Sequence, residues 1–509
     1  MTNNDIVQKL WNLCDVLRDD GINYSDYVTE LVLLLFIKME EEVATIRPDA
    51  AHILPKGCRW QDLISKSGTT QMDHYRQMLL DLGKSADPLL AAIYANANTS
   101  LKEPRHLATL VSSIDKIDWF SAREDGLGDL YEGLLEKNAS ETKSGAGQYF
   151  TPRALIDSMV RLVQPQAGET IQDPAAGTAG FLIAADRYIK DQTDNLYALK
   201  TKEQNFQIHK AFIGMELVPN TRRLALMNCL LHGMEGGDQG VVHIGNTLGA
   251  DGTQLPKSDI IFSNPPFGTA KGGGGPTRDD LTFETSNKQL AFLQHIYRHL
   301  KPGGRAAVVL PDNVLFEAGK GKDIRNDLMH KCNLHTILRL PTGIFYAQGV
   351  KTNVLFFSKG SVKDPQQEEN CTQKTWVYDL RTNMSSFGKR NLFSEKHLNE
   401  FEKAYGKKAD GSSKRTDQGE EGRFCCFDRK WIRERGDSLD ISWLKDDDVT
   451  DAADLPEPAV LAAEAMGELT EALRELNELI IALGSEDEAK QQRELLSEAL
   501  GLVAVGGEV

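Results

Sequence analysis

Several features that would set this chain apart from ordinary globular enzymes are missing from its sequence. Its seven cysteines lie at 14, 58, 229, 332, 371, 425 and 426 and form no CxxC pair, which argues for reduced thiols and against a disulfide framework or a zinc site. The longest purely apolar run, 31–37, is far shorter than the roughly 18 to 20 residues of a membrane helix. The first residues lack the basic start and apolar stretch of a signal peptide. We therefore expect a cytoplasmic protein with no membrane segment and no bound metal.

The sequence also lacks a surplus of basic residues. Its 74 Asp and Glu outnumber its 58 Lys and Arg, for a net charge of −16, whereas contacts to nucleic-acid phosphates normally need a basic surface. If the chain acts on nucleic acid, its basic groups are concentrated on one face or a partner carries much of the contact. The hydrophobic content of 40% is that of an ordinary globular protein. A length of 509 residues suggests about three or four domains.

Helical periodicity dominates residues 1–145. Apolar residues recur at helical spacing in two successive stretches, Ile6–Leu17 and Val28–Met39. Apolar faces of this kind usually pack into a core. We therefore predict an N-terminal helical domain over 1–145.

From 146 to 360 the pattern changes to short β-rich runs that alternate with amphipathic helices. Such alternation predicts an α/β fold, a mostly parallel sheet with helices on both faces. Ligands of such folds bind beyond the carboxyl ends of the strands. The expected strands are Thr170–Gln172, Ala211–Met215, Val241–Ile244, Asp259–Phe262, Ala306–Leu310, Thr336–Leu340 and Asn353–Phe357.

The chain after residue 360 is less regular until its last segment. A strand is expected at Thr375–Leu380 and an exposed polar loop at Lys403–Arg423, within a peripheral, mixed and loop-rich region over 361–454. In 455–509, the apolar residues from Ala462 to Leu483 follow a 4-3-4-3 spacing over three heptads. This spacing predicts coiled-coil-like C-terminal helices that dock a partner. The alternative is that this segment folds back onto its own chain.

A glycine-rich turn, DPAAGTAGF (173–181), lies between the first expected strand and a helix. Small residues let the backbone approach a ligand closely, and the helix N-terminus offers N–H groups to a carboxylate. Glu216 ends the next expected strand, where a carboxylate can accept hydrogen bonds from both hydroxyls of a ribose. The usual separation of about 20 residues is exceeded here, which we attribute to an insertion at 191–204. Each feature alone also fits an ordinary turn or an exposed glutamate.

The most informative motif is NPPF (264–267), which directly follows the β-rich run Ser258–Ser263. Two consecutive prolines fix a rigid turn and leave the Pro265 carbonyl outside any helix or ladder. That carbonyl and the Asn264 amide oxygen can accept the two hydrogens of a planar exocyclic amine, while Phe267 can stack on the ring that carries the amine. In duplex DNA such an amine is reached only by rotating the nucleotide out of the stack.

A further element, GQYFTPR (147–153), stands just before a helix. Its aromatic pair and hydroxyl could wall a methionine or adenosine moiety, although alone it would indicate only a helix start. The order GQYFTPR, DPAAGTAGF, GMEL (214–217) and NPPF resembles the amino-methyltransferases that place the cofactor motifs before the catalytic one. DPAAGTAGF and LPTGIFYAQGVKTNVLFF (340–357) resemble the EcoKI-like modification subunits of type I restriction-modification systems, and this similarity extends through 456–469.

The resemblance implies a Rossmann-like S-adenosylmethionine-dependent methyltransferase domain over 146–360 that methylates N6 of adenine in double-stranded DNA at specific sites. It also implies three kinds of protein partner, namely a specificity subunit, a second copy of the chain and a restriction subunit. The more general GxG form of the turn is replaced here by Thr178, Ala179 and Gly180. The cofactor contacts carried over from the family are Gln148, Tyr149, Phe150, Thr151, Pro152, Arg153, Asp173, Thr178, Ala179, Gly180 and Glu216, and the residues that would hold the target adenine are Asn264, Pro265, Pro266 and Phe267.

Two other functions remain open from the residues alone. An NPP-aromatic turn also serves glutamine side chains and guanine amines, so a protein-glutamine or RNA amino-methyltransferase is the main alternative. A non-catalytic assembly scaffold is the second. Cytosine C5 methylation needs a nucleophilic thiol, and no Pro-Cys dipeptide occurs. No GxxxxGK[ST] loop occurs either, so DNA translocation and cleavage would belong to another chain.

Overall fold

The structure, a computed structural model, describes residues 3–22, 26–46, 52–120, 126–141, 150–268, 276–345, 350–388 and 391–445. The described residues up to Leu444 belong to one compact unit. The predicted heptad segment from Ala462 to Leu483 lies outside the described residues, as do Gln148 and Tyr149. Among the helices described, none is long and apolar enough to cross a membrane.

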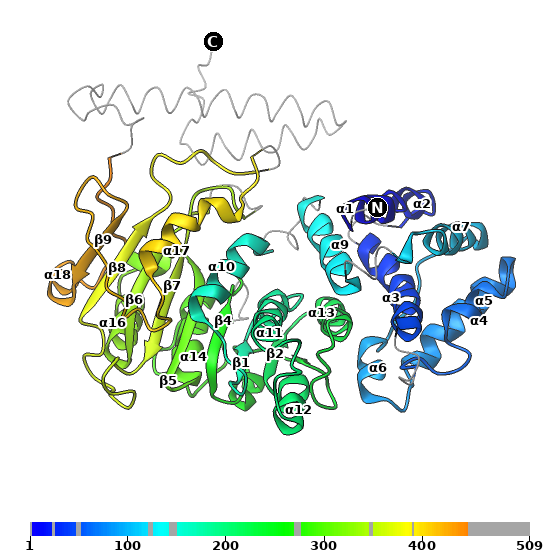
Figure 1. Ribbon diagram of the computed structural model, residues 1–509, viewed down its shortest axis with the longest axis horizontal. Coiled ribbons are helices and arrows are strands. Elements are labelled where there is room, and N and C mark those ends of the chain that lie inside the picture. Colours follow the sequence, from blue (N-terminus) through cyan, green and yellow to red (C-terminus); the bar gives the residue numbers. More distant parts are fainter. Residues whose placement is uncertain are drawn as a thin grey trace, which may run out of the picture. The chain divides into compact units, whose positions relative to one another are not determined.

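The described chain before Ile171 contains helices only (Figure 1). The central one is α3, whose apolar run 31–37 is buried on every side. A helix that is apolar all round needs neighbours all round, and α3 packs against α4, α7, α9 and α13. The helices of this region are α1 (Asn3–Asn12), α2 (Cys14–Asp19), α3 (Tyr27–Ile46), α4 (Trp60–Ile64), α5 (Gly68–Leu82), α6 (Pro88–Ile93), α7 (Pro104–Asp115), α9 (Leu127–Glu141) and α10 (Arg153–Val163).

In the described part of the chain, a nine-stranded sheet has the order β3-β2-β1-β4-β5-β7-β6-β8-β9. The pairs β5–β7, β7–β6 and β8–β9 are antiparallel, and all other neighbouring strands of this sheet are parallel. The carboxyl ends of β1, β2 and β4 therefore meet at one edge. The strands are β1 (Ile171–Asp173), β2 (Phe212–Glu216), β3 (Val242–Ile244), β4 (Ser258–Ser263), β5 (Leu300–Pro311), β6 (Cys332–Arg339), β7 (Thr352–Lys359), β8 (Lys374–Asp379) and β9 (Phe424–Asp428).

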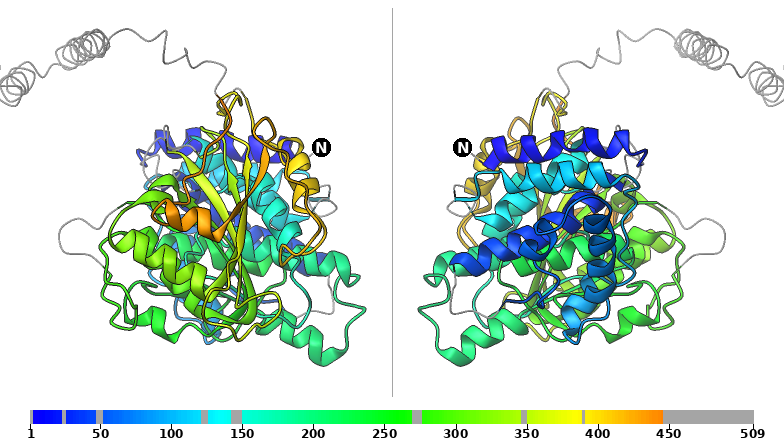
Figure 2. Two further views of the ribbon diagram at one scale, coloured as in Figure 1. Left: turned by 90° about the vertical axis from the view of Figure 1, so that its left-hand side faces the viewer. Right: turned by 90° about the vertical axis from the view of Figure 1, so that its right-hand side faces the viewer.

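Apolar residues alternate between the two faces of this sheet, and helices cover both faces. On β5, Ala306 and Val308 belong to one core while Ala307 and Val309 belong to the other, as the two-residue period of a strand requires. Residues of α14 and α16 fill the first core, and residues of α10, α11 and α17 fill the second (Figure 2). The remaining helices are α11 (Gly180–Gln192), α12 (Thr201–His209), α13 (Pro219–Leu231), α14 (Lys288–His299), α15 (Asp312–Phe316), α16 (Lys320–Lys331), α17 (Asn399–Tyr405) and α18 (Arg429–Glu434).

The expected α/β class is confirmed, and each of the eight strands expected from the sequence overlaps an observed one, β1 to β8. The exposed loop expected at Lys403–Arg423 is wrong in part. Its first residues complete α17, and Tyr405 is fully buried. The Arg415 guanidinium lies 4.6 Å from the centre of the Tyr405 ring and donates a hydrogen bond to Thr336. Long-range packing of this kind leaves no local pattern in a polar sequence.

Candidate active site

A pocket of about 480 Å³ lies at the carboxyl ends of β1, β2 and β4. Residues of α9, α10, α11 and α13 and the first residue of α14 also line it. This is the edge at which α/β folds bind their ligands. The sequence elements 150–153, 173–180, 216 and 264–266 all contribute residues to this one pocket.

Asp173 ends β1 and joins that strand to the NPPF motif. Its Oδ1 accepts hydrogen bonds from the backbone N–H of Ala175 and from the hydroxyl of Ser263, each at 3.0 Å. Ser263 is the last residue of β4, next to Asn264. Asp173 is 1% exposed, and this burial, assisted by repulsion from Glu216, raises the pKa of its carboxyl to about 7. A buried acid thus fixes the relative position of the two strand ends.

The turn between β1 and α11 is held in an unusual backbone conformation. Gly177 has a φ of +54° and Ala179 a φ of +69°, a left-handed region that glycine enters without a steric cost and alanine does not. Ala179 therefore adopts a conformation usual for glycine. The side-chain amide of Asn228, on α13, donates to the carbonyl of Thr178 at 3.0 Å. This bond ties the turn to α13.

Glu216 ends β2 and reaches across to the turn. Its Oε2 accepts from the N–H of Gly177 at 3.1 Å, and its Oε1 accepts from the N–H of Val218 at 2.8 Å. Burial raises the pKa of this carboxyl. Leu217 and Val218 line the pocket beside it with largely exposed apolar side chains. A polar acceptor and an apolar surface therefore lie side by side at the end of β2.

Asn264 follows β4 directly and is 8% exposed. Its side-chain amide nitrogen donates to the hydroxyl of Thr151 at 2.9 Å. Thr151 is equally buried and precedes Pro152, the N-cap residue of α10. Both Asn264 and Thr151 line the pocket. The element before α10 and the motif after β4 are thus in direct contact.

Arg153 is the first residue of α10, and its guanidinium turns toward α9. It donates to the carboxylates of Asp129 and Glu132, both on α9. Arg187, on α11, pairs with Asp129 at 3.4 Å and with Asp157 at 2.8 Å. These ion pairs connect α9 to α10 and α11, and all three helices line the pocket.

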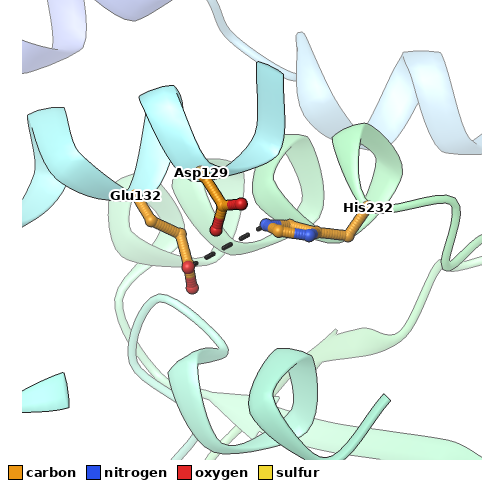
Figure 3. A group of neighbouring side chains, drawn as sticks. All are labelled: Asp129, Glu132 and His232. Atoms are coloured by element: carbon orange, nitrogen blue, oxygen red, sulfur yellow. Dashed lines mark ion pairs between the residues drawn. The ribbon is translucent and has the colours of Figure 1, made fainter. Parts of the chain in front are cut away.

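His232 completes this cluster from the C-terminal end of α13. Figure 3 shows Asp129 and Glu132 pointing from α9 toward its ring. The Oε2 atom of Glu132 lies 4.0 Å from Nε2 of His232. The three side chains are close enough to share a cation. The Arg153 guanidinium already supplies positive charge to both carboxylates. Burial also lowers the pKa of His232 to about 4, so we interpret the cluster as a charge-balanced connection between helices.

Comparisons with known proteins agree on one family for this chain. A profile of the N-6 DNA methylases matches residues 122–442, the HsdM N-terminal domain matches 6–114, and the C-terminal domain of the type I restriction enzyme methylase subunit matches 455–498. The chain is 56% identical to the type I restriction enzyme EcoKI methylase subunit of Escherichia coli K12, with 98% of this chain and 99% of that one covered. It is 57% identical to the StySJI methylase subunit of Salmonella typhimurium, with 99% and 100% covered.

The crystal structure of the EcoKI M protein shares 52% sequence identity with this chain and has a TM-score of 0.58, covering 97% of this chain and 99% of that one. The chain belongs to the methylase subunits of type I restriction enzymes. It is therefore a site-specific DNA methyltransferase that modifies N6 of adenine, and it is the modification subunit of a type I restriction-modification system. The resemblance stated from the sequence is confirmed.

Most of the predicted site residues of this methylase subunit gather at the pocket. Phe150, Thr151, Arg153, Asp173, Thr178, Gly180, Glu216, Asn264 and Pro266 line it. Pro152 caps α10, Ala179 is buried within the turn and Pro265 is buried beside Asn264. Phe267 is half-buried and packs against the larger core, so it does not form part of the pocket wall. Gln148 and Tyr149 lie outside the described residues.

Sequence reasoning missed the contribution of α9 to the pocket of the methylase subunit. Glu132, Leu135 and Glu136 line the pocket, yet they stand in a helical region with no recognisable motif. It also missed Asn228 and Arg187, which come from helices between the motifs. Leu217 and Val218 could have been found, because they directly follow Glu216.

Proposed function

We propose that the pocket binds S-adenosylmethionine as the methyl donor. The observation that carries the proposal is the meeting of separate sequence elements through three hydrogen bonds, Asp173–Ser263, Gly177–Glu216 and Thr151–Asn264. The volume of about 480 Å³ suits a small organic ligand, for which about 300 to 1,000 Å³ is usual.

The residues present fit the parts of this cofactor. A carboxylate has about four acceptor sites, so Glu216 can accept from ribose hydroxyls in addition to its two backbone donors. Leu217 and Val218 offer an apolar surface to the adenine ring. The first-turn N–H groups of α11 suit the methionine carboxylate. The other contacts carried over from the family, Gln148 to Arg153 among them, belong to this proposal.

When bound, the cofactor supplies an electrophilic methyl group on a positively charged sulfur. In our proposal the amide oxygen of Asn264 and the carbonyl of Pro265 accept the two hydrogens of the adenine N6 amine. This withdraws the nitrogen lone pair from conjugation with the ring and directs it at the methyl carbon. Held in this way, the amine nitrogen would be able to accept the methyl group that the cofactor supplies and would release one proton. Pro266, which lines the pocket, makes the turn rigid. Phe267, the next residue along the chain, would stack on the base from outside the residues that line the pocket.

We further propose that the substrate is double-stranded DNA from which the target adenine is rotated into the pocket. The net charge of −16 makes strong phosphate binding by this chain alone unfavourable. Sequence recognition would therefore reside in a specificity subunit, in a cytoplasmic complex that holds a second copy of this chain and, in the full enzyme, a restriction subunit.

A transfer assay with labelled S-adenosylmethionine tests the proposal. The complex of this chain with its specificity subunit is given duplex DNA carrying the target site, the same duplex with N6-methyladenine at the target, a translation release factor, and RNA. We expect label on the unmodified duplex only, and none with Asn264→Ala. Transfer to glutamine or RNA would favour the alternative substrates. Absence of cofactor binding by calorimetry would favour a scaffold.

A further inference from the structure

Thr151 and Asn264 are 113 residues apart in the sequence and 2.9 Å apart between Oγ1 and Nδ2. Each is 8% exposed. The family resemblance implies a cofactor contact for Thr151 and a substrate contact for Asn264. The hydrogen bond joins these two roles, which the sequence had assigned to separate motifs.

The bond orients the side-chain amide of Asn264, whose oxygen is the atom that methyl transfer would use. An amide group offers hydrogen-bond donors on its nitrogen and an acceptor on its oxygen. With the nitrogen directed at Thr151, the oxygen lies at the other end of the same planar group. A donor-only partner such as an adenine amine needs that oxygen. A side chain fixed in this orientation before the base arrives requires no reorientation during the reaction, which is the general advantage of a preorganised site.

Thr151 is well placed to fix the amide. Its neighbour Pro152 caps α10 and has a restricted φ, and the α10 backbone continues from there, so the hydroxyl is carried by a rigid part of the chain. On the other side, Asn264 follows β4, whose last residue Ser263 is itself bonded to Asp173. The two ends of the hydrogen bond are therefore held independently.

We propose that Thr151 is a positioning residue for methyl transfer, whose hydroxyl accepts from the Asn264 amide nitrogen and so orients the amide oxygen for the target amine. The inference rests on the proposed role of Asn264 as the amine acceptor. It assigns Thr151 an effect on the rate of transfer, distinct from the cofactor contact that the family resemblance implies.

Two substitutions separate these roles. Thr151→Val keeps the shape of the side chain and removes the hydroxyl that accepts from the buried Asn264 nitrogen. Thr151→Ser keeps the hydroxyl and removes a methyl group. Thr109→Val is a control for the same exchange at an exposed site, because the Thr109 hydroxyl donates to the Arg105 carbonyl of its own helix α7. All three are measured in the complex with the specificity subunit, by single-turnover methylation, calorimetric cofactor affinity and melting temperature.

We expect Thr151→Val to slow single-turnover methylation by roughly 10- to 100-fold, the effect of one buried hydrogen bond on a barrier. Its cofactor dissociation constant should rise by a much smaller factor than the rate falls, and Thr151→Ser should restore the rate to within about threefold. A normal rate in Thr151→Val would overturn the inference, as would a loss of cofactor affinity that accounts for the whole rate effect. If Asn264→Ala itself methylates normally, the proposed site fails, whereas a defective Asn264→Ala beside a normal Thr151→Val refutes this inference alone.

Discussion

The backbone N–H of Gly177 donates to Oε2 of Glu216 at 3.1 Å, so the glycine-rich turn after β1 and the carboxylate at the end of β2 form one structure. The positive φ of Gly177 directs its N–H at the neighbouring strand end. Glu216 therefore has two functions in the proposed site. It orders the turn, and it offers its remaining acceptor sites to a ribose.

Replacement of Glu216 tests both functions together. We expect Glu216→Ala to weaken S-adenosylmethionine binding by about 1 to 3 kcal/mol, the usual effect of losing a hydrogen bond to a charged group. Glu216→Gln keeps an acceptor oxygen for Gly177 and should lose less. Calorimetric titration of the complex measures both variants. An affinity unchanged in Glu216→Ala would contradict the ribose role.

Replacement of the two residues proposed to hold the target base should separate cofactor binding from methyl transfer. We expect Asn264→Ala to abolish methyl transfer and Phe267→Ala to reduce it severely, because both groups are proposed to hold the base and not the donor. Cofactor affinity should remain nearly unchanged in both. Calorimetry and a single-turnover assay on one preparation check this, and loss of cofactor binding in either variant would refute the assignment.

The ion pairs of Arg153 predict a role in stability, whereas the family resemblance implies a cofactor contact. Its guanidinium pairs with Asp129 and Glu132, and burial already raises the pKa of Glu132 while Arg153 opposes that rise. Arg153→Leu leaves the Glu132 carboxylate without its main counter-charge. We expect a loss of stability of about 1 to 3 kcal/mol and a lower melting temperature.

A second substitution identifies the cause. Glu132→Gln in the Arg153→Leu background removes the uncompensated charge, so the double variant should be more stable than Arg153→Leu alone, as a double-mutant cycle would detect. If Arg153 acted only as a cofactor contact, the melting temperature of the single variant would not change and its cofactor affinity alone would fall.

The sequence was sufficient for strands β1 to β8 and for the residues at their ends, but it did not predict β9 or the connections between the strands. Glu216 and NPPF could be found because they directly follow β-rich runs, whose period and length are local properties. The wall formed by Glu132 and Glu136 could not, because only the packing of α9 against α1 and α13 brings it to the pocket. The burial of Tyr405 was missed for the same reason. A polar segment that is ordered by distant residues looks like a loop in the sequence.

Asp173 should make stability depend on pH. Burial raises its pKa to about 7 from an ordinary value of 3.8. A raised pKa in the folded chain means that its contribution to stability is present below about pH 4 and is lost as the pH rises toward about 7. Asp173→Asn keeps an acceptor oxygen for Ala175 and Ser263 but cannot ionise. The difference in melting temperature, variant minus wild type, should therefore be more favourable at pH 8 than at pH 5.

Asp259 on β4 supplies the matched control. Burial alone would raise its pKa, but hydrogen bonds from Lys301 and Thr170 lower it below 3.8. Its contribution to stability is lost only as the pH falls below that value, so Asp259→Asn should shift the melting temperature by similar amounts at pH 5 and pH 8. If Asp173→Asn behaved like Asp259→Asn, Asp173 would be ionised at both pH values and the predicted dependence would be wrong.

The last prediction concerns the C-terminal segment and the way in which an acidic chain reaches its DNA. The profile of the type I methylase C-terminal domain matches 455–498, and the heptads from Ala462 to Leu483 lie within it. Apolar residues at 3.5-residue spacing can pack into the grooves of partner helices. Truncation before Pro456 should therefore leave S-adenosylmethionine binding intact and abolish both complex formation and site-specific methylation.

Because a truncation removes the whole C-terminal segment at once, point substitutions make the test sharper. Leu473 falls on the apolar 4-3-4-3 pattern of the sequence and Glu475 does not. Leu473→Lys should weaken assembly with the specificity subunit strongly, since a charge at a core position must be desolvated, while Glu475→Lys makes the larger change in net charge and should leave assembly nearly normal. Size-exclusion chromatography of the mixed subunits measures both. If the truncated chain still assembled, or if the chain alone methylated one defined DNA sequence, recognition could not depend on a partner docked at this segment.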